Sequence, residues 1–282
     1  MTAAAADPSL DADLERRFGG LRRLYGDAGY ARVRSARVAV VGLGGVGSWT
    51  VEALARSGVA RLVLFDLDHV AESNINRQVQ ALGRTLGQAK GEALRERIAD
   101  IHPGCEVVVI DDFVGPDNWP ALLPAPVDAL IDACDQVRAK LALAEWALRE
   151  QVPLVCVGAA GGKQQPQRVE VEDLQDTTHD PLLASLRQRL RKAQAAPRQG
   201  RIGLRCVFSR EAVARPIEAA CDVAGTPDAA PATPGAPLAC HGYGSSVTVT
   251  ATFGMVAAAE ALAHLQAQPR ARQQAQAPVS AA

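Results

Sequence analysis

Residues 37–49 read RVAVVGLGGVGSW: a short β-branched run, a glycine-rich turn, and the start of a segment suited to a helix. Only glycine permits so tight a turn and lets phosphate oxygens approach the backbone N–H groups, while the helix N-terminus adds partial positive charge. The stretch therefore predicts a nucleotide-binding loop made by Gly42, Gly44, Gly45 and Gly47. The alternative is a turn in which glycine serves only helix packing.

Strand-like and helix-like segments alternate around this loop. The strand-like segments are continuous apolar runs, which is typical of parallel strands covered by helices on both faces. The expected strands are 37–42, 61–66, 105–110, 127–132 and 152–158, and the expected helices are 48–57, 86–101 and 137–150. The sequence predicts an α/β fold with a Rossmann-like, doubly wound, mostly parallel sheet.

Beyond residue 160 the pattern changes to an alternating strand (QRVEVEDL), a basic helix over 181–192 and a short strand (LRCVFS), which predicts a C-terminal α+β extension packed on the same sheet. We expect a disordered leader (1–13), a nucleotide-binding domain with an N-terminal arm (14–160), a substrate-binding portion (161–266) and a disordered tail (267–282). Ser245 to Leu265 is apolar, but its Thr, Glu and His residues favour a buried amphipathic helix over a membrane span.

Composition narrows the possible partners. The chain has 282 residues, 48% of them hydrophobic and 4% aromatic, which predicts a large aliphatic core. Its net charge of −1 gives no global attraction to nucleic acid or membranes, so no DNA partner is expected. The six cysteines include no C-x-x-C pair, so the usual structural zinc site is not expected. The start of the chain has no apolar signal-peptide core, and a cytoplasmic location is expected.

A carboxylate follows the next strand. Asp66 ends the expected strand 61–66, where it can accept hydrogen bonds from ribose hydroxyls. The glycine loop and this carboxylate predict a nucleotide site, but they fit NAD at least as well as ATP.

Cations after Asp66 favour ATP. Residues 67–78 read LDHVAESNINRQ, and GQAK follows at 87–90. A triphosphate carries about four negative charges, and Arg77 offers it a bidentate fork while Lys90 offers a point charge. Asn74 and Asn76 can donate amide hydrogen bonds.

The fourth strand adds an acid. It ends in DACD (132–135), which places Asp135 at the carboxyl edge of the sheet, where a Mg²⁺ bridging the phosphates needs a hard oxygen ligand. ATP and Mg²⁺ are the cofactors expected.

The segments GLGGVG, FDLD, SNINRQ, GQAK and DACD resemble the adenylation domain of ubiquitin-activating-type enzymes and their bacterial relatives in molybdopterin and thiamin synthesis, over about residues 14–160. The resemblance implies that Gly45 and Asp66 contact adenosine, and that Asp135 holds Mg²⁺. The cofactor-binding residues expected from these motifs are Gly42, Gly44, Gly45, Gly47, Asp66, Asp68, Ser73, Asn74, Asn76, Arg77, Gln78, Lys90, Asp132 and Asp135, with Arg77, Lys90 and Asp135 acting in catalysis.

The resemblance also implies a homodimer, in which an arginine from the partner's N-terminal arm completes each ATP site. Here the arm reads RRFGGLRRLYG, and Gly20 occupies the usual arginine position. Arg22 or Arg23 is the expected substitute.

Further segments resemble one subfamily, the tRNA threonylcarbamoyladenosine dehydratases, over roughly residues 14–266. They are RFGGLRRLYG, GVGSW, NRQVQAL, DDFV, VGAAGGKQQPQ, DPLLASLRQRLRK, LRCVFS and HGYGSSVTVTATFGMVA. This implies ATP-dependent cyclisation of threonylcarbamoyladenosine in tRNA through a carboxyl-adenylate. The alternative is activation of the C-terminal glycine of a ubiquitin-like sulfur-carrier protein, which the missing zinc cysteines disfavour.

Between Asp180 and Glu211 the chain carries cations and no acidic residue. Such a run is a plausible footprint for a phosphate backbone, although a solvated helix face is the alternative. The residues expected to contact tRNA are Arg187, Arg189, Arg191, Lys192, Arg198, Arg201 and Arg205, and Arg210 ends the run.

Cys240 lies in PLACHGYGSS, where the subfamily also has a cysteine. It is a candidate for a transient thioester or for accepting sulfur from a cysteine-desulfurase accessory protein, and a packed thiol is the alternative we favour. A non-catalytic nucleotide-binding scaffold remains the rival from outside the enzymes.

Overall fold

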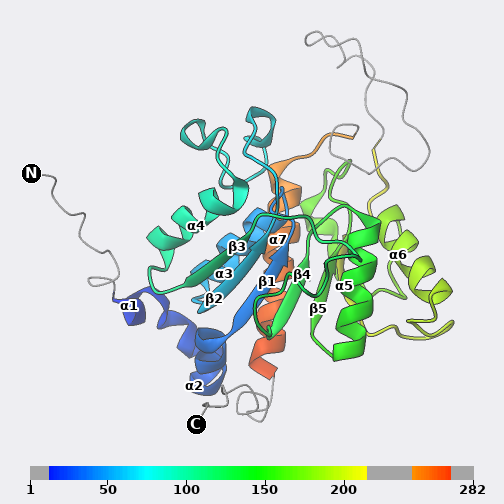
Figure 1. The fold of residues 1–282 in the computed structure, drawn as a ribbon, viewed down its shortest axis with the longest axis horizontal. Helices are drawn as coiled ribbons and strands as arrows, with labels where there is room; N and C mark the ends of the chain where they lie inside the picture. The colour runs from blue at the N-terminus through cyan, green and yellow to red at the C-terminus, as the bar shows by residue number, and fades with distance from the viewer. Residues whose placement is uncertain (1–12, 215–242, 268–282) are drawn as a thin grey trace, which may run out of the picture.

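A seven-stranded sheet forms the centre of the computed structural model, which describes residues 13–214 and 243–267 (Figure 1). The strand order is β3-β2-β1-β4-β5-β7-β6, and every neighbouring pair is parallel except β6 with β7. The strands are β1 (Arg37–Val41), β2 (Arg61–Phe65), β3 (Glu106–Ile110), β4 (Ala129–Asp132), β5 (Leu154–Val157), β6 (Val169–Asp173) and β7 (Arg205–Ser209). This confirms the predicted α/β fold.

Helices cover both faces of the sheet. They are α1 (Leu14–Phe18), α2 (Gly20–Ser35), α3 (Gly47–Arg56), α4 (Lys90–Ile101), α5 (Val137–Glu150), α6 (Pro181–Lys192) and α7 (Val247–Ala267), with short 3-10 turns η1 (Glu72–Asn74), η2 (Gly83–Thr85) and η3 (Pro166–Arg168). Because strand residues alternate between faces, Val38 and Val40 pack with α3, α4 and α7, whereas Ala39 and Val41 pack with α5 and α6. The core is aliphatic, as the composition predicts.

The chain leaves β1 and β4 toward opposite faces, since α3 and α5 belong to different core clusters. In open parallel sheets, such a reversal opens a crevice at the carboxyl ends of the two strands. The glycine loop after β1 and residues 133–136 after β4 therefore face the same crevice.

Helix α7 packs on α3, directly behind the glycine loop (Figure 1). A Cβ on Gly254 would lie 2.6 Å from the Val46 carbonyl oxygen, and the Thr50 hydroxyl donates to the Gly254 carbonyl at 3.2 Å. Among the described residues, α7 is the one helix with the length and apolar composition of a membrane span. Val249, Phe253 and other apolar residues of α7 are instead buried in the protein core.

Most expected boundaries agree with the structure, and α5 and α6 agree at both ends. The helix expected over 86–101 is wrong in its first turn, because α4 begins only at Lys90. Gly87 has a φ of +81° and pairs through its N–H with the Val70 carbonyl, so this segment is a turn. The leader was expected over 1–13 and the tail over 267–282, but Asp13 caps α1 and Ala267 ends α7. The remainder of both segments, and Cys240, lie outside the described residues.

Candidate functional site

The glycine loop is built by close backbone contacts. Gly42 has a φ of +86°, and a Cβ there would lie 2.9 Å from the Cys134 backbone nitrogen. A Cβ on Gly47 would overlap the Gly42 carbonyl oxygen. Side chains at either position would separate the loop from the strand β4 exit, so both glycines are required sterically. Gly42, Gly44 and Gly45 line the cavity, whereas Gly47 is packed behind it.

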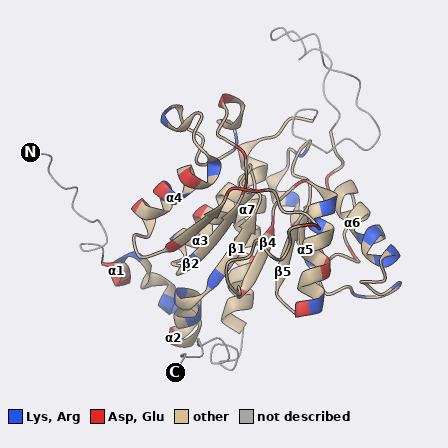
Figure 2. Ribbon diagram, in the orientation of Figure 1, with Lys and Arg blue, Asp and Glu red and all other residues tan. Residues whose placement is uncertain are grey.

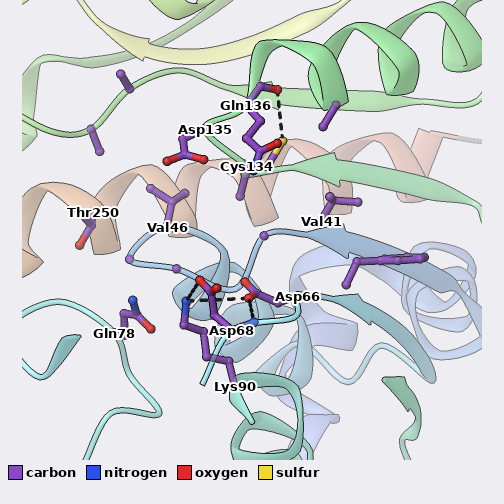
Figure 3. Close-up of a pocket in the computed structure, with 18 of the residues that line it drawn as sticks. Val41, Val46, Asp66, Asp68, Gln78, Lys90, Cys134, Asp135, Gln136 and Thr250 are labelled. Carbon is purple, nitrogen blue, oxygen red and sulfur yellow. Dashed lines mark hydrogen bonds and ion pairs between the residues drawn. The ribbon is translucent and has the colours of Figure 1, made fainter. Parts of the chain in front are cut away.

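Asp66 ties this loop to the end of β2. Its carboxylate accepts from the Leu43 N–H at 2.6 Å and from the Asp68 N–H at 2.9 Å, and it lies 3.8 Å from the Lys90 ammonium (Figure 3). Burial raises the pKa of Asp66, while Lys90 and the two backbone N–H groups act in the opposite direction. The carboxylate is therefore both a structural anchor and a wall of the cavity.

Lys90, the first residue of α4, is almost fully buried and points into the cavity. Its ammonium pairs with the Asp68 carboxylate at 2.6 Å (Figure 3). The Asp68 side chain is 56% exposed, so this is a pair between a buried cation and a solvated anion. A phosphate entering the cavity would compete with Asp68 for the same ammonium.

Arg77 is oriented by the loop that carries it. Its Nη1 donates to the Ser73 carbonyl at 2.6 Å and to the Asn76 side-chain oxygen at 2.9 Å, and its carbonyl accepts from Trp49 Nε1 at 2.9 Å. The Arg77 Nε is buried without a hydrogen-bond partner among the described residues. Gly45 lies beside it, since a Cβ there would be 3.3 Å from Arg77 carbons. Arg77 lines the cavity, and its guanidinium is held by these contacts.

Residues 133–136 form the opposite wall. Asp135 and Gln136 are exposed and line the cavity, and Cys134 lies between them and the sheet (Figure 3). The Cys134 thiol donates to the Asp132 Oδ1 at 2.9 Å, and burial together with Asp132 raises its pKa well above the ordinary value. Cys134 is thus a protonated thiol that lines the cavity and packs against the core.

Four expected cofactor-binding residues do not line the cavity. Gly47 supports the loop from behind, and Ser73 and Asn76 bind Arg77 instead of facing the cavity. Asp132 is fully buried in an ion pair with Lys140 at 3.0 Å. The expected residues that do line it are Gly42, Gly44, Gly45, Asp66, Asp68, Asn74, Arg77, Gln78, Lys90 and Asp135.

The structure adds a wall that the motif analysis missed, made by residues 158–161 after β5. Distant residues hold this segment: Asp180 accepts from the Ala159 N–H at 2.8 Å, and the Glu211 carboxylate accepts from Gln164 and Gln165 N–H groups. The buried Lys163 ammonium donates to the carbonyls of His179, Ser209 and Glu211. The glycine-rich run GAAGG was the available signal in the sequence, but it does not indicate which distant residues hold the segment.

The expected tRNA-binding cations separate into two groups. Arg187 donates to the carbonyls of Leu174, Gln175 and Thr177, and Arg191 donates to the Gln175 side chain. Arg205 pairs with Glu260 at 3.0 Å, and Arg210 with Glu170 at 2.6 Å. These four cations are engaged within the protein, so they are less available to a phosphate backbone than the exposed ones.

Exposed cations remain at the far end of α6 and in the loop after it (Figure 2). They form no ion pair with a described acidic residue, and they are Arg189, Lys192, Arg198 and Arg201. Leu182, at the start of the same helix, lines the cavity. One helix therefore connects the cavity with an exposed basic surface.

Comparisons with known proteins identify similar chains over nearly the whole length. The model of the ThiF family matches residues 17–279. The tRNA threonylcarbamoyladenosine dehydratase of Escherichia coli is 44% identical over 89% of this chain and 94% of that protein. The protein with the same description from Haemophilus influenzae is 40% identical over 86% and 90%, respectively.

Solved structures agree. The E. coli tRNA N6-threonylcarbamoyladenosine dehydratase in complex with ATP matches with a TM-score of 0.79 at 40% identity, covering 94% of this chain and 99% of that one. The same enzyme in complex with AMP matches with a TM-score of 0.78.

Proposed function

The chain belongs to the ThiF family, and on that premise we propose that it catalyses the ATP-dependent dehydration of threonylcarbamoyladenosine in tRNA. The observation that carries the proposal is the cavity itself, in which Arg77 and Lys90 face the glycine loop and Asp135 faces them from the wall after β4. The similarity to tRNA dehydratases, which extends over both halves of the chain, supports this choice of substrate.

The reaction has two chemical steps. The free carboxylate of threonylcarbamoyladenosine attacks the α-phosphate of ATP, which forms the carboxyl-adenylate and releases pyrophosphate. The carbamoyl oxygen of the same group then attacks the activated carbonyl, which closes the oxazolone ring and releases AMP. Because the second step is intramolecular, holding the two groups in place supplies much of its rate.

Arg77 and Lys90 stabilise negative charge on the phosphates. Arg77 lines the cavity, and its contacts with Ser73 and Asn76 orient the guanidinium before a phosphate oxygen arrives. Lys90 transfers its contact from the Asp68 carboxylate to phosphate. Asn74 lines the same cavity, although its side-chain oxygen accepts from the Ala71 N–H at 3.0 Å.

Asp135 is the residue suited to Mg²⁺. It is an exposed carboxylate beside the phosphate-facing groups, and among the described residues no cluster of three or more His, Cys, Asp or Glu side chains forms a metal site of its own. This fits Mg²⁺, which is commonly bound by one or two carboxylates together with substrate phosphates. When bound, Mg²⁺ neutralises phosphate charge.

The exposed cations of α6 and the following loop are the proposed tRNA contacts: Arg189, Lys192, Arg198 and Arg201. Phosphate contacts of this kind supply affinity that does not depend on base sequence. Since α6 begins at the cavity, it aligns the basic surface with the reacting nucleoside.

We further propose that the enzyme is a cytoplasmic homodimer. Arg22 is occupied by Glu15 at 3.1 Å and Asp27 at 3.3 Å, whereas Arg23 is exposed and forms no ion pair among the described residues. Arg23 is therefore the better candidate for reaching a partner's ATP site. An accessory protein of a cysteine desulfurase is a further candidate partner.

The decisive experiment is ATP–pyrophosphate exchange with two possible substrates. We expect exchange with tRNA that carries threonylcarbamoyladenosine and none with a ubiquitin-like carrier protein. In a strain lacking the protein, nucleoside analysis of tRNA should show uncyclised threonylcarbamoyladenosine. Exchange with the carrier alone, or unchanged cyclic nucleoside in that strain, contradicts the proposal.

A further inference from the structure

The pairing of strands β4 and β5 ends at the floor of the cavity, and the Val157 carbonyl there has no strand partner. Beyond the last paired residues, Asp132 and Cys156, the Ala133 N–H turns to the Val41 carbonyl on β1 and the Gly158 N–H turns to the Val207 carbonyl on β7. The next donor in the ladder, the Cys134 N–H, binds the Asp132 Oδ1 instead of β5, so the Val157 carbonyl faces a gap. A buried carbonyl without a donor is costly, so this gap requires a polar group.

The side chain of Lys140, from α5, fills the gap. Its ammonium donates to the Val157 carbonyl at 2.7 Å and to the Asp132 carbonyl at 3.3 Å, and it lies 3.0 Å from the Asp132 Oδ2. Both Lys140 and Asp132 are fully buried. Burial lowers the pKa of Lys140, but the adjacent Asp132 carboxylate outweighs this and raises it overall. The lysine is a cation inside the sheet.

Three walls of the cavity begin at this point. The Asp132 Oδ1 accepts from the Cys134 N–H at 3.2 Å and from its thiol, which sets the turn that leads to Asp135. Val157 leads into the wall at 158–161. A Cβ on Gly42 would lie 3.0 Å from the Ala133 carbonyl oxygen, so the glycine loop rests on the same backbone.

We propose that Lys140 is a positioning residue for adenylation: by joining the ends of β4 and β5, it sets Asp135 and the 158–161 wall relative to the phosphates held by the glycine loop. The inference rests on the proposed function. It predicts that Lys140 affects the chemical step more than ATP binding, because the cations that hold the phosphates are on other elements.

A purely structural role is the competing explanation, and a double variant separates the two. Lys140→Met alone leaves the Asp132 charge buried without a partner, so it should destabilise the fold. Adding Asp132→Asn removes that charge while the two carbonyls remain without the ammonium. Leu143→Ala is the matched control, because it removes a fully buried side chain one turn later on α5, away from the strand ends.

Melting temperature, ATP affinity and the kcat of tRNA-dependent pyrophosphate exchange are measured on the full chain. For Asp132→Asn/Lys140→Met we expect recovery of most of the melting temperature, an ATP Kd within about threefold of the unmodified protein, and a kcat reduced on the order of 100-fold. Leu143→Ala should lower the melting temperature. Its kcat, measured well below that temperature, should be unchanged. A double variant with recovered stability and unchanged kcat overturns the proposal.

If the double variant does not fold, Lys140→Arg tests whether Lys140 is a positioning residue. It keeps the charge beside Asp132, but a planar guanidinium does not place one nitrogen between two carbonyls as an ammonium does. We expect a folded protein with reduced kcat, and unchanged kcat overturns the inference. If the unmodified protein shows no exchange with tRNA, the proposed function fails instead.

Discussion

At the scale of single residues, the oriented guanidinium of Arg77 gives the sharpest expectation. Arg77→Ala removes a preorganised donor from the reacting phosphates, so we expect kcat for pyrophosphate exchange to fall by about 10²–10³-fold. Arg84→Ala, at an exposed position of the same connection in η2, is the control and should leave exchange unchanged. Full activity of Arg77→Ala would remove the guanidinium from the proposed mechanism.

Asp68 has the opposite effect on nucleotide binding, because it occupies the Lys90 ammonium before phosphate arrives. Asp68→Asn frees that ammonium and removes a negative charge from the cavity. Since Asp68 is largely exposed, the gain is small, and we expect the ATP Kd to fall by up to about fivefold at low salt. Calorimetry at two ionic strengths measures this. Weaker binding by the variant would show that Asp68 itself contacts the nucleotide.

Residue roles were predictable from the sequence where a single motif contains the residues that form the site. The glycine loop, Asp66 and Asp135 follow strand ends directly, and Arg77 and Lys90 lie in motifs that follow Asp66, so all of them were expected at the cavity that they line. The burial of Asp132 in an ion pair could not be predicted, because its partner, Lys140, lies on the next helix and no sequence pattern indicates the pair. The contacts of Arg187 were unpredictable for the same reason, since its carbonyl acceptors come from another segment.

At the scale of elements, periodicity identified the strands and the interior helices, since each such element is a local apolar pattern. It misplaced the start of α4, where tertiary pairing with residue 70 turns the chain. The 158–161 wall was missed because its shape depends on Asp180 and Glu211, which follow it in other elements.

The contact between Phe18 of α1 and His102 predicts that the stability of the fold depends on pH. Arg34 Nη1 donates to His102 Nε2 at 2.7 Å, and the His102 ring packs 4.7 Å from that of Phe18 on α1. Burial, with Arg34 and Arg17 nearby, lowers the pKa of His102 to about 4. A depressed histidine pKa stabilises the fold above its unfolded value of about 6.5, and this contribution is lost as pH falls toward 4.

His102→Phe keeps the ring contact and removes the titrating group. We expect it to reduce the loss of unfolding free energy between pH 6.5 and 4, which denaturant titrations at several pH values measure. The carboxylates that also titrate there are common to both proteins and cancel in the comparison. Identical pH profiles would show that folding does not lower the pKa of His102.

At the scale of the whole molecule, the basic surface predicts the salt dependence of tRNA binding. Replacing Arg189, Lys192, Arg198 and Arg201 with Ala should weaken tRNA binding and reduce the slope of log K against log salt by about 0.7–0.9 per lost phosphate contact. ATP affinity should stay the same, because none of the four lines the cavity. Arg95→Ala, which removes one cation from the surface of α4, is the control, and an unchanged slope in the quadruple variant would exclude the basic surface.

The junction of α3 and α7 has a consequence for the timing of biosynthesis. Thr50 and Gly254, which meet through a hydrogen bond, are 204 residues apart. At about 5–20 residues per second, a ribosome needs roughly 10–40 s to deliver the second after the first. In a nascent chain, the glycine loop is therefore made long before α7, the helix that packs behind it. The nucleotide site cannot be completed until translation is nearly finished.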